Sequence, residues 1–220
     1  MMVARFGLLA ALVLALGACA GALTSPPAKL YTLNPATQAD PSLPRADFQL
    51  LVEAPVAGAA LDTQRIAVEK TATSIDYLAE SAWTDRAPAM IQGLIVQSFE
   101  DSRKIVSVGR DSVGLRSDFV LRSELRDFEA KYSAPGAANP DRVHVRIAAK
   151  LVGMPRRTIE AGETFEAIVP VRDGGVQGVV TAFDAALRQV MERMVAWTLR
   201  TGTAIAGGGG TATGGASRTR

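Results

Sequence analysis

Cys19 is the residue in this sequence best placed to do covalent chemistry. It is the single cysteine among 220 residues, and it follows an apolar stretch from Phe6 to Leu16 and the small residues Gly17 and Ala18. A thiolate attacks a lipid donor more readily than a hydroxyl does. Because no second thiol is present, an intrachain disulfide is excluded. We therefore expect Cys19 to carry a modification rather than a crosslink.

The residues before Cys19 have the features of a secretory signal. Arg5 provides a positive start, and the apolar stretch is shorter than the roughly 20 residues that a permanent membrane span needs. The junction Leu16-Gly17-Ala18-Cys19 resembles the lipobox of bacterial lipoproteins. In those proteins the sulfur is diacylglycerylated, the signal is removed and the new amino terminus is acylated, so the mature chain should begin at Cys19. An ordinary cleaved signal with a chance cysteine is the alternative.

No set of side chains has the composition and spacing of a catalytic or metal centre. His144 is the single histidine, and its register in a predicted strand points it toward solvent. No His/Cys/Asp cluster has zinc-site spacing, and no serine lies in a Gly-x-Ser-x-Gly elbow. The turn Gly174–Gly178 lacks the Lys-Ser/Thr pair of a phosphate-binding loop, which favours a plain strand-to-helix turn. We predict a protein that is not an enzyme and has no cofactor or metal; a hydrolase would have to use His144.

Charge and length narrow the class of protein further. The 24 basic and 22 acidic residues are interleaved along the chain, whereas a nucleic-acid binder normally shows a concentrated basic face. Nucleic acid is therefore not expected as a partner. The residues from Cys19 onward are numerous enough for one well-buried domain.

Alternating apolar residues predict the strands. The clearest case is Val143–Leu151; Asp118–Glu129 alternates for several residues, and the loop Ser133–Asp141 should join these two segments into a hairpin. A further strand is expected over Thr158–Val171. Shorter strands are predicted at Gln49–Val52, Ile66–Glu69, Ser74–Leu78, Ile105–Val108 and, near the amino terminus, Lys29–Leu33.

Apolar residues at helical spacing predict two main helices. The first should start with Thr84 or Asp85 as its N-cap, tolerate Pro88 in its first turn, and bury Met90, Ile91, Leu94, Ile95 and Phe99. The second is predicted from Gln177 to Arg200, with Gly202 as the C-cap glycine and a buried stripe of Phe183, Leu187, Val190, Met194 and Trp197.

These elements predict an α+β fold, a two-layer sandwich of a mostly antiparallel sheet with two main helices packed on it. The expected organisation is a signal peptide over residues 1–18, a lipidated N-terminus and Pro-rich tether over 19–47, and a folded domain over 48–202, with residue 30 as an alternative start. Residues 203–220 form a Gly-rich tail that is expected to be disordered.

Three motifs, in this order after the lipobox, resemble the ABC-type transport auxiliary lipoprotein family. They are Tyr31–Pro35, Ile75–Trp83 with Pro88 shortly after it, and Ser117–Leu121. The resemblance covers residues 31–200. It implies a non-catalytic lipoprotein component of a mammalian-cell-entry-type lipid transport system, with an ABC permease, its ATPase and a ring-forming mammalian-cell-entry-domain periplasmic protein as partners. Self-association into a homo-oligomer is left open.

The lipoprotein resemblance also bears on the membrane that holds the chain. In many Gram-negative bacteria an aspartate after the lipidated cysteine retains a lipoprotein in the inner membrane, whereas this chain has Ala20. We therefore expect a lipid anchor at the periplasmic face of the outer membrane. The alternative function is a stand-alone outer-membrane lipoprotein that binds a hydrophobic ligand in a groove between the sheet and the helices.

Two features are candidates for surface contacts. Tyr77 and Trp83 could belong to a partner surface, because aromatic side chains supply much of the binding energy at interfaces, although a core position is an equal alternative. A basic strip on the exposed sheet face is predicted from Arg122, Arg126, Arg142, Arg146 and Lys150. Glu124 and Asp127 dilute that strip, so a solvated face is the default and an anionic lipid or acidic partner is the alternative.

Overall fold

The computed structural model describes residues 27–36, 40–110, 116–134 and 136–208. The predicted signal peptide, Cys19 with its lipobox and the tail beyond residue 208 lie outside the described residues. The described elements are β1 (Lys29–Tyr31), β2 (Ala46–Val52), β3 (Val56–Ala57), β4 (Arg65–Thr71), β5 (Ser74–Trp83), α2 (Ala87–Ser102), β6 (Ile105–Arg110), β7 (Phe119–Lys131), β8 (Arg142–Gly153), β9 (Thr158–Pro170) and α3 (Gly175–Gly208).

The described strands form one sheet that is organised around β7. On one side β7 pairs with β8 from Phe119 opposite Gly153 to Lys131 opposite Arg142, and β8 pairs with β9, both antiparallel. On its other side β7 pairs in succession with β2, β3 and β4, all parallel to it. Strand β6 lies beyond β2, while β5 and then β1 lie beyond β4. Because the long β7–β8–β9 ladders supply most of the pairing, the sheet is mostly antiparallel, as predicted.

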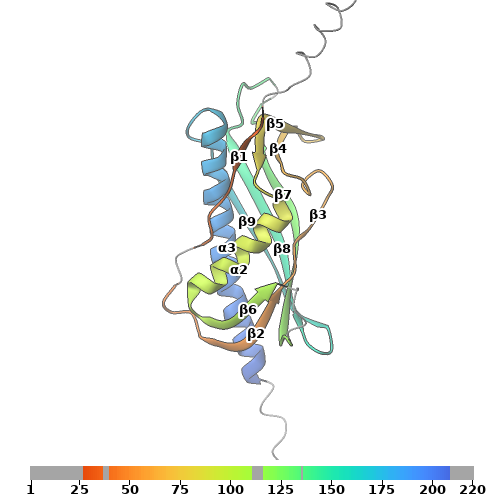
Figure 1. Cartoon of the computed structure of the whole chain (residues 1–220), viewed down its shortest axis with the longest axis vertical. Coiled ribbons are helices and arrows are strands. Elements are labelled where there is room, and N and C mark those ends of the chain that lie inside the picture. The colour runs from red at the N-terminus through yellow and green to blue at the C-terminus, as the bar shows by residue number, and fades with distance from the viewer. Residues whose placement is uncertain (1–26, 37–39, 111–115, 135, 209–220) are drawn as a thin grey trace, which may run out of the picture.

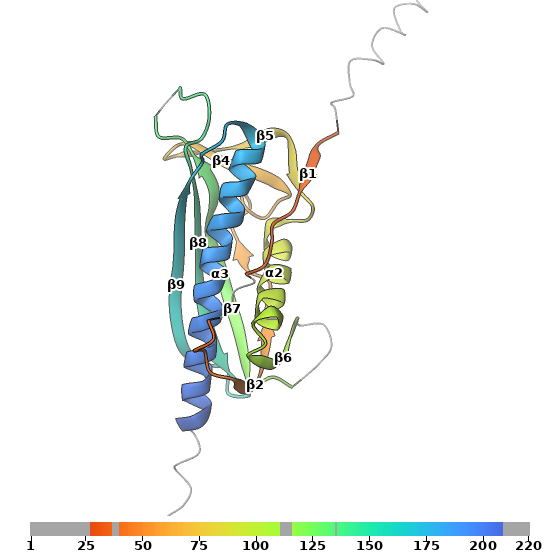
Figure 2. The same ribbon diagram turned by 90° about the vertical axis from the view of Figure 1, so that its left-hand side faces the viewer.

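Both helices lie on one face of this sheet, and α3 runs along the long axis of the molecule (Figures 1 and 2). Helix α3 packs mainly on β8 and β9, whereas α2 packs mainly on β6. The apolar face predicted for α2 is confirmed, because Met90, Ile91, Leu94, Ile95 and Phe99 are all buried. The predicted fold class, two helices on a mostly antiparallel sheet, is therefore confirmed.

An aromatic cluster fills the space between the sheet and α3. Trp83 at the end of β5, Phe128 on β7 and Phe183 on α3 are each almost completely buried. The Trp83 ring centroid lies 5.6 Å from that of Phe128 and 5.2 Å from that of Phe183. Aromatic pairs at these separations add to the free energy gained by burying apolar area. The cluster ties the first half of the chain to its last helix.

The described part of the segment before β2 belongs to the folded body rather than to a free tether, which favours the alternative domain start at residue 30 over the boundary at residue 47. Strand β1 pairs with the end of β5, as the alternation of Lys29–Leu33 suggested. Leu33, Ala36 and Leu43 are buried in the main core. The Ala36 N–H also donates a 2.9 Å hydrogen bond to Ser98 Oγ on α2.

The ends of both helices differ from the prediction. Helix α2 begins at Ala87 with Arg86 as N-cap instead of Thr84 or Asp85, and Arg103 ends it in the left-handed conformation. Helix α3 continues to Gly208, so Gly202 lies inside the helix and is not its C-cap. Among the described residues, no helix combines the length and the apolar character that a membrane span requires.

Position 202 inside α3 is occupied by glycine because a neighbouring ring leaves no room for a side chain. A Cβ built there would come within 2.6 Å of two ring carbons of Phe48, and this ring is buried and packs edge-on against Phe119. We expect Gly202→Ala to lower the free energy of unfolding by about 1 kcal/mol, since overpacking outweighs the gain in helix propensity. Urea unfolding followed by circular dichroism measures it.

The matched control is Gly207→Ala in the same helix, where an added Cβ meets nothing within 4 Å. It should leave the stability unchanged or raise it slightly. Equal stabilisation by both substitutions would contradict the close contact between Gly202 and Phe48.

Candidate functional site

The two aromatic residues predicted for a partner surface occupy different environments. Trp83 has an exposed fraction of 0% and belongs to the aromatic cluster, so it occupies the core position that was the alternative to a partner surface. Tyr77 is half-buried; its hydroxyl donates a 3.2 Å hydrogen bond to the Ala60 carbonyl, and the Arg65 guanidinium lies 3.7 Å from its ring centroid. Of the two, only Tyr77 keeps exposed surface.

The face of β7, β8 and β9 that points away from the helices, here called the outer face, carries the predicted basic strip. Its residues alternate with the buried ones, such as Val143, Val145 and Ile147 on β8. Most of its cations already have an acidic partner: Arg122 pairs with Glu53, Arg126 with Glu124, Arg142 with Asp141 and Arg146 with Asp127. Lys150 differs from them, because no acidic partner reaches it from the described part of the chain.

His144 lies on the outer face but is not solvent-exposed, which corrects the sequence-based expectation. Its exposed fraction is 9%. The Nε2 atom lies 2.6 Å from Glu166 Oε1, and Nδ1 lies 3.6 Å from Asp127 and 3.9 Å from Glu129. The carboxylates come from the neighbouring strands, since His144 is paired directly with Glu129 across the β7–β8 ladder. An isolated strand pattern contains no signal for such a cluster.

Lys131 completes this cluster from the end of β7. Its Nζ lies 3.2 Å from Glu129 Oε1 and 3.0 Å from Glu69 Oε2 on β4. Burial alone would lower the pKa of Lys131, but the hydrogen bonds to Glu69 and Glu129 outweigh burial and raise that pKa. For Glu129 burial prevails: it raises the pKa of the carboxyl even though the Phe128 N–H and Lys131 bond to it.

Three residues of the cluster have the chemistry of metal ligands. Asp127, Glu129 and His144 place potential ligand atoms within 4.8 Å of one another, so the folded chain brings together a set that sequence spacing did not reveal. The Lys131 ammonium, however, lies 3.2 Å from Glu129 and 4.0 Å from Asp127. A divalent ion would have to displace this positive charge. The geometry therefore favours an ion-pair network over a metal centre.

The raised pKa of Glu129 predicts a pH-dependent contribution to stability. In the unfolded chain this carboxyl loses its proton near the ordinary value of 4.5. The folded state holds the proton to higher pH, so Glu129 makes the protein less stable as pH rises from that value through the raised pKa. We expect Glu129→Gln to remove this loss, so that the variant gains stability relative to the parent between mildly acidic and neutral pH. Chemical denaturation at a series of pH values measures the difference.

The matched control is Glu163→Gln on β9, an exposed carboxylate that forms no ion pair in the described region. Its difference from the parent protein should not follow the same trend with pH. A stability difference for Glu129→Gln that stays constant over the range would contradict the raised pKa.

A shallow groove of about 410 Å³ lies at the other end of the outer face. Arg122, Arg126, Lys150 and Arg157 line it together with the apolar side chains of Val56, Val152 and Ile159. Exposed fractions of 71% for Val56 and 58% for Ile159 are high for residues of this type. The groove therefore combines apolar surface with basic groups.

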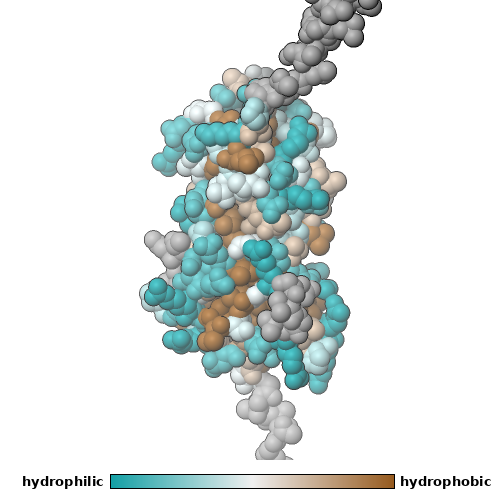
Figure 3. Space-filling view, in the orientation of Figure 1, coloured by the Kyte–Doolittle hydropathy of each residue, from teal (hydrophilic) through white to brown (hydrophobic). Residues whose placement is uncertain are grey.

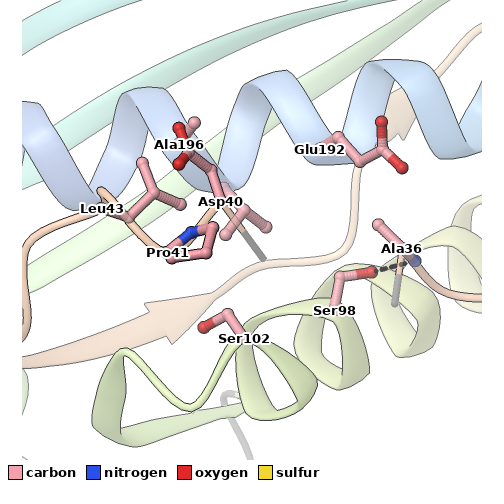
Figure 4. Close-up of a pocket in the computed structure, with 9 residues that line it drawn as sticks. Ala36, Asp40, Pro41, Leu43, Ser98, Ser102, Glu192 and Ala196 are labelled. Carbon is pink, nitrogen blue, oxygen red and sulfur yellow. Dashed lines mark hydrogen bonds between the residues drawn. The ribbon is translucent and has the colours of Figure 1, made fainter. Parts of the chain in front are cut away.

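The space between the sheet and the helices was the alternative location for a hydrophobic ligand. The aromatic cluster and its apolar neighbours fill this space. A cavity of about 300 Å³ lies instead between α2, α3 and the side chains of Ala36, Asp40, Pro41 and Leu43 (Figure 4). Ser98 Oγ in this cavity accepts from Ala36 N–H and donates to the Leu94 carbonyl. Asp40 also lines it, and hydrogen bonds from Ser42 lower the pKa of Asp40. Apolar side chains gather along the middle of the face that carries α2, between hydrophilic ones (Figure 3).

The turn between β9 and α3 has a structural explanation for its glycines. Gly175 has a φ of +80°, a left-handed conformation that glycine adopts without a steric penalty. The interpretation of Gly174–Gly178 as a strand-to-helix turn is therefore confirmed for Gly174 and Gly175, whereas Gly178 already lies in the first turn of α3.

Comparisons with known proteins agree with the fold. A crystal structure of protein XCC0632 from Xanthomonas campestris is similar to this chain with a TM-score of 0.76 and 32% identity, over 82% of this chain and 99% of that one. A second crystal structure, of an uncharacterized protein, aligns with a TM-score of 0.58 at 15% identity over 80% of this chain and 98% of the other, which is a likeness of fold alone.

Sequence comparisons point to one family. Protein bll6063 from Bradyrhizobium diazoefficiens is 25% identical over 174 residues, which are 77% of this chain; the match spans only 44% of that relative's length. Residues 31–195 match the model of the family described as the ABC-type transport auxiliary lipoprotein component. Since this match covers three quarters of the sequence and includes α2, most of α3 and almost the whole sheet, the chain belongs to the ABC-type transport auxiliary lipoprotein family.

Proposed function

We propose that this protein is the lipid-anchored periplasmic auxiliary component of a mammalian-cell-entry-type lipid transport system. In this role it docks on the ring-forming mammalian-cell-entry protein and links that protein, with its ABC permease and ATPase, to the outer membrane. The observation that carries the proposal is the family match over residues 31–195. The lipobox at Cys19 and the alanine that follows it support an anchor at the outer membrane.

The shape of the body suits a link between a membrane and a partner. Cys19 lies ten residues before β1, and ten extended residues span at most about 35 Å. The first and last described residues lie at opposite ends of the long axis (Figure 1), and the 34 residues of α3 extend about 50 Å along it. An anchor at Cys19 would hold the β1 end near the membrane and leave the carboxyl-terminal end of α3 free to meet a partner.

We propose that the protein performs this role without catalysing a reaction. His144, the one histidine, is hydrogen-bonded to Glu166 and lies within 4 Å of two more carboxylates. No hydrogen bond or ion pair in the described region joins it to a serine or threonine. This arrangement supports a structural part for His144 in the ion-pair network rather than that of a base which activates a nucleophile.

Affinity purification after crosslinking in living cells tests the proposal. A tagged copy of the full chain, solubilised in mild detergent, should elute together with a mammalian-cell-entry-domain protein, a permease and an ATPase. A tagged lipoprotein of another family, expressed at the same level, is the control and should elute without them. Separation of the two membranes on a density gradient should place the chain in the outer-membrane fraction. Elution of the chain alone after crosslinking would refute the docking role.

A further inference from the structure

We propose that the groove on the outer face binds one molecule of an anionic phospholipid. The phosphate would lie against Lys150 and Arg157, and an acyl chain would lie along Val56 and Ile159. The choice of a membrane lipid as the source of the phosphate rests on the proposed function in lipid transport. The location of the site rests on the groove itself.

The charge of the groove is the first argument. Arg122 and Arg126 also line it, but both are paired: Arg122 contacts the two carboxylate oxygens of Glu53 at 2.9 and 3.0 Å. Two nitrogens of Arg126 lie 3.1 Å from Glu124 Oε2, and Glu124 is the one acid that lines the groove in the described chain. Lys150 and Arg157 have no hydrogen bond or ion pair to an acid in the described ranges. Two cations without counter-ions at one concave surface attract an anion, and guanidinium and ammonium groups are the usual phosphate ligands in proteins.

The apolar part of the groove is the second argument. Val56 on β3 and Ile159 on β9 are among the most exposed large apolar side chains of the described chain, and both line this groove beside the buried Val152. A soluble anion such as inorganic phosphate would gain nothing from covering them. An acyl chain would gain from covering them, since the transfer of each methylene group out of water is favourable by about 0.8 kcal/mol.

The dimensions of the groove favour a small amphiphile over a protein partner. Its volume of about 410 Å³ is in the range of small-molecule sites. A protein partner needs a much larger area, about 800 Å² on each side for an interface of standard size. The neighbouring part of the outer face is occupied by the ion pairs around His144 and Lys131, which leaves it little unpaired charge for an acidic protein.

Native mass spectrometry of the full chain in mild detergent tests the site. The protein is titrated with dioctanoyl phosphatidylglycerol, with dioctanoyl phosphatidylcholine and with inorganic phosphate, and noncovalent adducts are counted beside the mass of any covalent lipid. We expect one adduct of phosphatidylglycerol per chain, weaker binding of phosphatidylcholine, and no adduct of phosphate. Replacing the octanoyl chains by hexanoyl chains should weaken binding.

Two sets of variants separate the charged from the apolar contribution. The double substitution Lys150→Gln and Arg157→Gln should weaken phosphatidylglycerol binding about tenfold or more. The double substitution Val56→Ser and Ile159→Ser should abolish the dependence on chain length; since both side chains are exposed, the fold should persist. The control is Arg45→Gln with Arg172→Gln, which removes two exposed cations that do not line the groove.

Three outcomes would overturn the proposal: an inorganic phosphate adduct as tight as that of the lipid, an equal loss of lipid binding in the control and in the Lys150/Arg157 variant, or no loss in either. None of them depends on whether the chain elutes with a mammalian-cell-entry protein. Failure of the groove and failure of the docking role are therefore distinguishable.

Discussion

Replacing Cys19 with serine is expected to abolish lipid attachment and to remove the protein from the membrane fraction. The hydroxyl is a much poorer nucleophile than the thiolate, so transfer of a diacylglyceryl group to residue 19 should fail. Cells grown with an alkyne-labelled fatty acid should label the parent protein and leave Cys19→Ser unlabelled. Intact-mass analysis of the parent should show a chain that begins at residue 19 and carries the added lipid.

The expected effect is nearly all-or-none because of how acyl chains hold a protein on a membrane. One chain gives marginal, reversible binding, whereas two or more chains, at about 0.8 kcal/mol for each buried methylene, make dissociation negligible. If the lipoprotein signal is replaced by an ordinary secretory signal, which is cleaved without lipidation, the Cys19→Ser variant should be recovered in the periplasmic extract.

Ala20→Ser is the matched control, since it changes a neighbouring residue and keeps the thiol. It should be labelled and should partition like the parent. A parent protein with a bare sulfur, or with the leader still attached, would refute the anchor and with it the bridging role.

The sequence was a good guide wherever one periodic pattern decides one face of an element. The alternation from Val143 to Leu151 predicted which side of β8 is buried, and the helical spacing from Met90 to Phe99 predicted the buried face of α2. These patterns work because the direction of a side chain follows from the geometry of its own element. They say nothing about what covers the opposite face.

That limit explains the error at His144. Its outward direction was predicted correctly, but the outer face at this point is covered by carboxylates from β7 and β9. The register of β7 is also shifted by a bulge between Leu125 and Asp127, so Leu125 and Phe128, three residues apart, both face the core. A bulge of this kind leaves no periodic signal.

The amino-terminal segment shows a second limit. Its prolines led to the prediction of a tether, but an extended chain can still pack on a core, and Leu33 and Leu43 do so. Likewise Gly202 is a normal C-cap candidate on local grounds, and only the distant Phe48 ring explains why a glycine is needed at this position inside α3. Both errors come from contacts between residues far apart in the chain.

Trp83→Ala is the substitution with the largest expected effect on stability. It removes a completely buried indole from the contact with Phe128 and Phe183. Truncating a large aromatic side chain in a core costs about 3 to 5 kcal/mol, a large share of the 5 to 15 kcal/mol that a domain has. For a domain of this size the melting temperature should fall by about 10 °C. Circular dichroism is the suitable probe, because the substitution removes a fluorophore.

Trp83→Phe separates packing from hydrogen bonding at this position. The Trp83 Nε1–H is buried without a hydrogen-bond partner in the described structure, so the phenylalanine variant loses volume but no hydrogen bond. It should retain more than half of the stability that alanine loses. If Trp83 were instead a partner contact, Trp83→Ala would unfold like the parent protein and fail only to elute with the transport components. Because Trp83 is buried, we expect Trp83→Ala to lose stability first. Any loss of partner binding would then follow from the loss of the fold.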